Sequence, residues 1–251
     1  MIEEIKNHIN KDDPTIVAMF EAGAHFGYSR SRRHASMASV MFGVKNRVEL
    51  FDLEKTKVYF EKAKAFIEGV GATGKQILFV SGKSEAKSSI VEQSSVFGTP
   101  YVAGRWLGGT LTNFAQLKTR MSRLVDLREQ KVKGELAKYT KKERLMIDRE
   151  IEKLEEMFGG ILPMKDLPGA LFVVDSKKEK TAIREAKKMR IPVVAIMGSD
   201  CDLSEVDYPI PANDSSSSSI KYFIEEIIRA YKIGKSRMII PISRELTDKK
   251  E

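Results

Sequence analysis

The chain has 251 residues, 42% of them hydrophobic, so it is long enough to bury a core without disulfides or metal ions. Its single cysteine excludes a disulfide within the chain, its three histidines offer no zinc-binding spacing, and no apolar run reaches the roughly 20 residues of a membrane span. The 43 Lys and Arg side chains outnumber the 35 Asp and Glu side chains, and the resulting net charge of +8 favours polyanionic partners.

The N-terminal part of the chain has the most uneven charge. Residues 1–6 have neither the apolar core of a signal peptide nor the Arg-rich character of a transit peptide, so we expect a cytoplasmic protein. Residues 22–48 contain no acidic side chain, and their cations alternate with aromatic rings. Because guanidinium groups bind phosphates and flat rings stack on unpaired bases, we interpret this segment as an RNA-binding surface. Its candidate contacts are His25, Tyr28, Arg30, Arg32, Arg33, His34, Lys45 and Arg47. The alternative is that Phe26 and Phe42 belong to the core and that the arginines are only solvated.

From residue 74 onward, short apolar runs alternate with charged stretches of helical periodicity. Three runs are apolar on both faces, as expected for strands of a parallel sheet that helices cover on each side. They are residues 76–80, 170–175 and 191–197. A further strand is expected at residues 100–103, and helices at residues 84–97, 177–189 and 215–233. The alternation predicts an α/β fold with a doubly wound parallel sheet.

Residues 105–160 interrupt this rhythm with a long charged segment. Two sets of apolar residues recur there at spacings of three and four, which predicts two helices packed as an antiparallel coiled-coil hairpin. The sets are Phe114, Leu117, Met121 and Leu124, and Ile147, Ile151, Leu154 and Phe158. Thr140 and Glu143 predict a capping box at the start of the second helix, and Gly134 lies in the connection. Residues 118–144 carry ten cations against four acids, and we select Lys118 and Arg120 as candidate RNA contacts.

Two glycine–lysine fragments raise the alternative of a nucleotide-binding enzyme or switch. The first, Gly69-Val-Gly-Ala-Thr-Gly-Lys-Gln76, follows an expected helix at residues 56–68 and precedes a strand, which is the reverse of the order that a phosphate cradle requires. We interpret it as a helix-ending turn. The second, Ser81-Gly-Lys-Ser84, does follow a strand and open a helix, but it lacks the upstream glycine of the nucleotide motif. We therefore expect Lys83 to meet a phosphate of RNA rather than a nucleotide.

No set of acid, base and nucleophile emerges, so we expect no catalysis, no cofactor and no metal. Asp175 ends a strand where α/β enzymes often place a catalytic carboxylate, but no histidine lies downstream, and we interpret it as a loop acceptor or helix cap. Cys201 lies between Asp200 and Asp202 without a nearby cation, which disfavours a reactive thiolate.

Five short strings of residues stand in order along the chain. They are Glu21-Ala-Gly-Ala-His-Phe-Gly27, Phe51-Asp-Leu-Glu-Lys-Thr56, Arg105-Trp-Leu-Gly-Gly-Thr-Leu-Thr-Asn113, Leu167-Pro-Gly-Ala-Leu-Phe-Val-Val-Asp175 and Asp207-Tyr-Pro-Ile-Pro211. Together they resemble the family of the second protein of the small ribosomal subunit, in its bacterial form. The resemblance runs over residues 19–233, and the third string is highly specific.

The resemblance implies a flavodoxin-like or Rossmann-like domain without a cofactor, which carries a helical hairpin. We expect this α/β domain at residues 1–104 and 161–234, the coiled-coil hairpin at residues 105–160 and a flexible tail at residues 235–251. The resemblance further implies binding to small-subunit ribosomal RNA, contacts with neighbouring ribosomal proteins and docking of the large first protein of the subunit, which recruits messenger RNA. We expect neither a membrane nor DNA as a partner. A protein-interaction module that works through the hairpin is a third interpretation.

Matching positions acquire expected roles from the resemblance. His25 and Arg33 fall in the RNA-facing N-terminal segment. Arg105 and Trp106 shape the root of the hairpin and are candidate RNA contacts there, where Trp106 is either a core anchor or stacks on a base. The chain departs from the family pattern at Tyr28, where many relatives have a second histidine, and at residues 34–37, where they have Trp-Asn-Pro-Lys.

Overall fold

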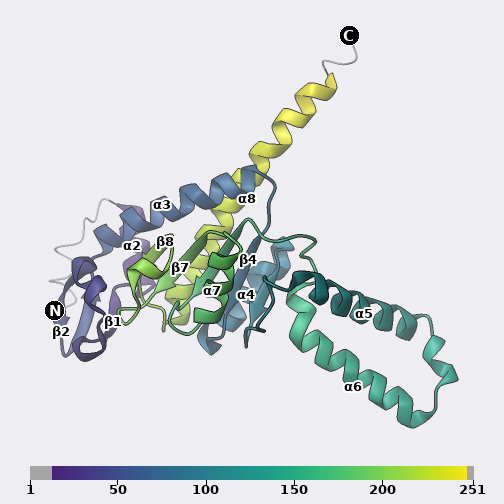
Figure 1. The fold of residues 1–251 in the computed structure, drawn as a ribbon. Helices are drawn as coiled ribbons and strands as arrows, with labels where there is room; N and C mark the ends of the chain where they lie inside the picture. Colours follow the sequence, from purple (N-terminus) through teal and green to yellow (C-terminus); the bar gives the residue numbers. More distant parts are fainter. Residues whose placement is uncertain (1–12, 248–251) are drawn as a thin grey trace.

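The computed structural model describes the backbone of residues 13–247 and the side chains of residues 13–238 (Figure 1). The expectation about residues 1–6 therefore lies outside the described residues. Within the described part of the chain, no helix combines the length and the apolar composition of a membrane span.

A five-stranded parallel sheet forms the centre of the molecule. Its strands are β4 (Ile77–Ser81), β5 (Tyr101–Ala103), β6 (Ala170–Val174), β7 (Val193–Met197) and β8 (Tyr208–Pro211). They lie in the order β5-β4-β6-β7-β8, and every neighbouring pair is parallel. Counted along the chain this order is 2-1-3-4-5, that of flavodoxin-like doubly wound sheets. The predicted fold class is confirmed.

Helices cover both faces of this sheet (Figure 1). Because side chains alternate along a strand, Ile77 and Phe79 face one layer and Leu78 and Val80 face the other. The first layer consists of α2 (Pro14–Glu21), α3 (Leu53–Ala72), α4 (Ser84–Phe97) and α8 (Ser217–Thr247). The second layer consists of α7 (Lys180–Lys188) and the root of the hairpin. The three central strands are buried along their whole length, as their apolar composition predicts.

Helix α8 is longer than expected. We predicted that it ends at residue 233 and that a flexible tail begins at residue 235, but the helix continues without a break to Thr247. That boundary was wrong because Gly234 lies inside the helix, at the point where α8 crosses α3. A Cβ atom built on Gly234 overlaps the backbone of α3, and one built on Gly71 would lie 2.5 Å from the carbonyl oxygen of Tyr231. Residues 248–251 of the predicted tail lie outside the described residues.

The same crossing explains the first glycine–lysine fragment. Helix α3 includes Gly69 and Gly71 and ends only at Ala72, and Gly74 follows with φ +72°. The predicted turn is therefore at Gly74, and Gly71 serves close helix packing rather than a phosphate.

The hairpin consists of two antiparallel helices that project from the sheet domain (Figure 1). They are α5 (Phe114–Val132) and α6 (Lys141–Phe158), joined through the short 3-10 helix η3 (Glu135–Lys138). Thr140 and Glu143 form the predicted capping box, and Gly134 adopts φ +73° in the connection. The predicted apolar stripes meet between the helices, where Leu117, Met121 and Leu124 pack with Ile151 and Leu154. Supercoiling of the two helices into a coiled coil stays a prediction.

Candidate nucleic-acid interface

A second, smaller sheet carries most of the predicted RNA-binding residues. Strands β1 (Phe26–Ser29), β2 (Met41–Lys45) and β3 (Val48–Phe51) form a three-stranded antiparallel sheet in the order β1-β3-β2. The 3-10 helices η1 (Arg30–Arg32) and η2 (Ala35–Val40) connect its first two strands. Ser199, which follows β7, ties this N-terminal sheet to the central one, because its hydroxyl accepts from the Tyr28 amide at 2.9 Å and its carbonyl accepts from the His34 amide at 2.9 Å.

The exposed cations of this sheet lie on η1 and at the tip of the β2–β3 hairpin. Arg30 and Arg32 are exposed on η1, and Arg47 is exposed in a two-residue turn. In that turn Asn46 and Arg47 both have positive φ, 50° and 67°. This geometry matches the twist of the flanking strands.

Arg32 lies over an aromatic ring. Its guanidinium carbon is 4.5 Å from the centre of the Tyr28 ring, while 59% of the side chain remains exposed. The Tyr28 hydroxyl forms a 2.6 Å hydrogen bond with the Ser215 hydroxyl, which holds the ring in place. Arg32 also lies 3.7 Å from a carboxylate oxygen of Asp200, whose side chain is only 7% exposed, but this distance is long for an ion pair. A planar cation stacked on a fixed ring is a geometry that suits both phosphate and base contact.

Arg33 forms an ion pair with a buried acid. Its Nη1 lies 3.0 Å from Oε1 of Glu49, whose side chain is fully buried at the centre of β3. Glu49 comes one residue after the acid-free segment, so the count over residues 22–48 missed it. Arg33 therefore has a structural role, and because 28% of its side chain remains exposed, its contact with RNA stays a prediction. His34 and Lys45 remain near this surface, and the His34 ring stays 44% exposed.

His25 is another correction. Its side chain is buried, and its ring lies between Phe20, at 4.4 Å, and Phe26, at 4.0 Å. Burial lowers the pKa of His25 to about 4, so the ring is neutral near pH 7 and bound inside the protein. The alternative that placed Phe26 and Phe42 in the core is also wrong, because these side chains are 48% and 53% exposed.

Lys83 lies at the carboxyl edge of the central sheet, in the crevice between β4 and β6. This is where the strand order reverses and where such folds bind ligands. Its ammonium group lies 2.6 Å from Oδ2 of Asp214 and 2.9 Å from Oδ2 of Asp175. Although burial works in the opposite direction, these carboxylates raise the pKa of Lys83 above its usual value. The side chain is 10% exposed, so we correct its prediction as a phosphate contact and assign it to an internal ion network.

A carboxylate of the protein itself also occupies the position beside Lys83 where an anion could bind. The amide of Gly82, in the second glycine–lysine fragment, donates to Oε1 of Glu179 at 2.7 Å. Burial raises the pKa of Glu179 above its usual value. Asp175 accepts from the amides of Lys177 and Lys178 at 3.0 and 3.1 Å, as the loop-acceptor interpretation predicts. This fragment therefore holds a carboxylate of the chain where a nucleotide-binding protein would hold a phosphate.

Cys201 completes the crevice. It is buried, and burial raises the pKa of its thiol to about 12, consistent with an unreactive side chain. Potential ligand atoms of Asp175, Cys201 and Asp214 lie within 4.8 Å of one another. The Lys83 ammonium contacts both carboxylates and takes the position that a bound cation would need.

Trp106 anchors the root of the hairpin to α7. It is 8% exposed, and its Nε1 donates to Oε1 of Glu185 at 3.0 Å. The same carboxylate accepts from the amides of Gly109 at 2.8 Å, Leu111 at 3.0 Å and Thr112 at 3.2 Å. Burial opposes ionisation, but these hydrogen bonds lower the pKa of Glu185 below its usual value.

The specific string at residues 105–113 is thus a loop wrapped around one buried anion. Trp106 belongs to the core and does not stack on a base, whereas Arg105 is exposed beside it. Sequence reasoning missed Glu185, although an acid between Ile183 and Ala186 on the apolar face of α7 was a visible signal.

Acidic side chains neutralise more of the hairpin's cations than the count over residues 118–144 indicated. Arg123 pairs with Glu150, Arg128 with Glu155 and Lys131 with Asp148, all between α5 and α6. The acids lie on the second helix, beyond the counted stretch. Lys118 lies 3.5 Å from Asp166, and Arg120 is exposed. Figure 1 places the hairpin and the N-terminal sheet at opposite ends of the molecule, so these predicted contacts do not form one surface.

Comparison with known proteins gives a consistent match. The family model described as "Ribosomal protein S2" matches residues 19–234. A small ribosomal subunit protein uS2 of Roseiflexus sp. (strain RS-1) is 44% identical over 220 residues, which cover 88% of this chain and 84% of the relative. The protein of the same name from Chloroflexus aggregans is 41% identical, with 89% and 94% covered. That of Nitratiruptor sp. is 41% identical, with 88% and 83% covered.

Proposed function

This chain belongs to the ribosomal protein S2 family, and we propose that it is a structural, non-catalytic constituent of the small ribosomal subunit in the cytoplasm that binds small-subunit ribosomal RNA. The observation that carries the RNA-binding proposal is the exposed cationic face of the N-terminal sheet, formed by Arg30, Arg32 and Arg47. The planar guanidinium group presents its donors in a fixed fork that matches phosphate oxygens, so less side-chain entropy is lost for each hydrogen bond that forms.

The interface residues divide into two groups. Arg30 and Arg47 would contact phosphate oxygens, which gives affinity without sequence preference. Arg32, stacked on Tyr28, and the exposed Phe26 ring would contact unpaired bases, since flat surfaces are what single-stranded RNA stacks on. Arg33 supports this face indirectly, because its pair with Glu49 holds the segment after η1 against β3.

The resemblance implies contacts with neighbouring ribosomal proteins, and we propose that the hairpin provides a surface for them. Exposed apolar side chains gather toward its tip, where Val132 is 88% exposed, Met146 62% and Leu145 51%. Such exposure favours contacts with neighbouring ribosomal proteins over a purely solvated face. Docking of the large first protein of the subunit belongs to the same proposal. We also propose that the chain divides into an α/β domain at residues 1–104 and 161–234 and a hairpin at residues 105–160.

The test compares two triple variants in binding to purified small-subunit ribosomal RNA. In the first, Arg30, Arg32 and Arg47 are replaced with Ala. In the control, Lys62, Lys221 and Arg229, which are exposed on α3 and α8, are replaced with Ala. The net charge is the same in both. We expect the first variant to bind more weakly, with a salt dependence of log K less steep by up to about three, and the control to bind like the parent. Equal losses in both variants would show that net charge, not this face, drives binding.

A further inference from the structure

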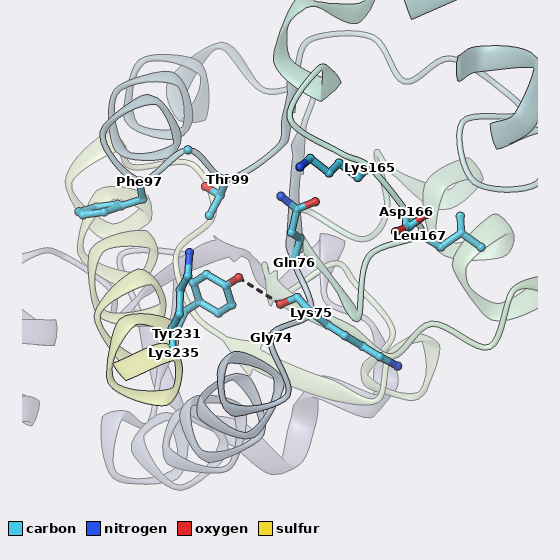
Figure 2. Close-up of a pocket in the computed structure, with 11 residues that line it drawn as sticks. Gly74, Lys75, Gln76, Phe97, Thr99, Lys165, Asp166, Leu167, Tyr231 and Lys235 are labelled. Atoms are coloured by element: carbon cyan, nitrogen blue, oxygen red, sulfur yellow. Dashed lines mark hydrogen bonds between the residues drawn. The ribbon is translucent and has the colours of Figure 1, made fainter. Parts of the chain in front are cut away.

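A pocket lies at the edge of the central sheet opposite the Lys83 crevice, where the chain enters β4, β5 and β6 (Figure 2). Its volume is about 520 Å³, within the range of small-ligand sites. Its walls come from four separate segments, namely the turn after α3, the end of α4, the segment before β6 and α8. None of the interactions described above uses this space.

Lysines from distant parts of the chain surround the pocket. Lys165 and Lys235 are exposed, and Figure 2 shows their ammonium ends directed toward the space beside Gln76, whereas the Lys75 side chain leads away from it. Among the described side chains, no ion pair engages Lys75, Lys165 or Lys235. Lys232 lies next to them, 3.6 Å from the centre of the Phe97 ring.

Negative charge near the pocket does not balance these lysines. The only acid that lines it within the described chain, Asp166, has a side chain that is 92% exposed and pairs with Lys118. The carboxyl ends of α3 and α4 lie here too, and each contributes about half a negative charge, so together they offset about one lysine. The site is therefore electropositive.

The remaining walls suit a nucleotide unit. Tyr231 donates its hydroxyl hydrogen to the Lys75 carbonyl at 3.1 Å, which holds its ring at the wall of the pocket (Figure 2). The Gln76 amide donates one hydrogen to the Pro163 carbonyl at 3.2 Å and has a second hydrogen to offer. Cations, an amide donor and aromatic rings around one hollow are the groups that bind a phosphate with its sugar and base.

We propose that this pocket is a second phosphate-binding site, which holds one backbone phosphate of ribosomal RNA between Lys165 and Lys235. The proposal rests on the proposed function, and it places RNA at the edge of the central sheet where β4, β5 and β6 begin, in addition to the N-terminal sheet. The protein then bridges two RNA segments.

The first experiment measures binding of the full chain to small-subunit ribosomal RNA over a range of salt concentrations. The pocket variant is Lys165→Gln with Lys235→Gln, and the control is Lys187→Gln with Lys188→Gln on α7, where both lysines are exposed. We expect the pocket variant to lose affinity and to show a salt slope less steep by about one to two, while the control keeps both. Unchanged urea unfolding of both variants checks that the fold is intact.

The second experiment maps proximity without relying on affinity. Cys201 is buried with a raised thiol pKa, so a cysteine introduced by Lys165→Cys can be labelled selectively with an iron chelate that generates hydroxyl radicals. We expect cleavage of bound RNA from position 165 and none from Lys142→Cys, an exposed position at the tip of the hairpin, which projects away from the sheet domain (Figure 1).

The outcomes separate the two proposals. A parent chain that fails to bind ribosomal RNA overturns both. A parent that binds, with a pocket variant that keeps its affinity and slope and with no cleavage from position 165, overturns the pocket alone. A third measurement tests binding of inorganic phosphate to the parent and to the pocket variant. If the pocket variant loses phosphate binding but keeps its affinity for RNA, the ligand of the pocket is a small anion, and the RNA assignment is contradicted.

Discussion

Replacing Lys83 with Met distinguishes the sequence-based role of this residue from its structural one. Methionine keeps the apolar stem but removes the charge that lies 2.6 Å from Asp214 and 2.9 Å from Asp175. The side chains of these acids are only 2% and 12% exposed, so the variant leaves two carboxylates close together with little access to water. Removing one partner of a buried ion pair costs about 3–5 kcal/mol, and two orphaned acids place the expected loss at the upper end.

Urea unfolding measures this loss. With a slope of about 2–3 kcal/mol per molar, the midpoint of Lys83→Met should fall by roughly 1.5–2 M. Lys118→Met, which breaks an exposed pair with Asp166, is the matched control and should change stability by less than about 1 kcal/mol. Adding Asp214→Asn to Lys83→Met should recover part of the loss, since it removes one unpaired charge. An unchanged midpoint together with weakened, less salt-dependent RNA binding would refute this reasoning and restore Lys83 as a phosphate contact.

Three further changes test other parts of the structure. Gly71→Ala should destabilise the protein by about 1–3 kcal/mol, because α3 and α8 are in close contact at this residue. Gly69→Ala has open space around it and should stabilise the protein by about 0.5–1 kcal/mol. Equal effects of the two substitutions in thermal unfolding would contradict the close packing of α3 and α8 at Gly71. Glu185→Gln should cost on the order of 2 kcal/mol and speed amide exchange at Gly109, and unchanged exchange would show that the loop does not depend on the carboxylate. His25 has a folded pKa of about 4 against 6.5 when unfolded, so its contribution is complete above pH 6.5 and is lost as the pH falls toward 4, by at most about 3 kcal/mol. His25→Phe should remove this part of the pH dependence of unfolding, and a pH profile identical to the parent's would contradict it.

The sequence predicts those features whose signal is local. Runs that are apolar on both faces identified the buried strands, and spacings of three and four identified α5 and α6 with their capping box. The N-terminal sheet was missed because its hairpin turn is Asn46-Arg47, without the glycine that marks such turns, and because Phe42 and Val44 put apolar side chains on its exposed face.

The roles of charged residues depend on contacts that sequence separation conceals. Lys83 follows a strand and opens a helix, as a phosphate ligand would, and nothing local reveals that Asp175 and Asp214 meet it from two other loops. The structural role of Arg33 was missed for a similar reason, since its buried partner Glu49 belongs to a strand that the sequence analysis did not predict. Arg30, Arg32 and Arg47 remain candidates because their side chains are exposed, and Arg32 stays 59% exposed although it lies 3.7 Å from the buried carboxylate of Asp200.

Binding of the unmodified chain to small-subunit ribosomal RNA, measured from low to high salt, tests the central claim most directly. Cationic side chains on the surface of the protein displace the counterions of RNA when they meet its phosphates, so log K should fall linearly with log salt, with a slope of about −2 or steeper from the N-terminal arginines. A complex whose affinity is independent of salt, or no complex at all, would contradict the account.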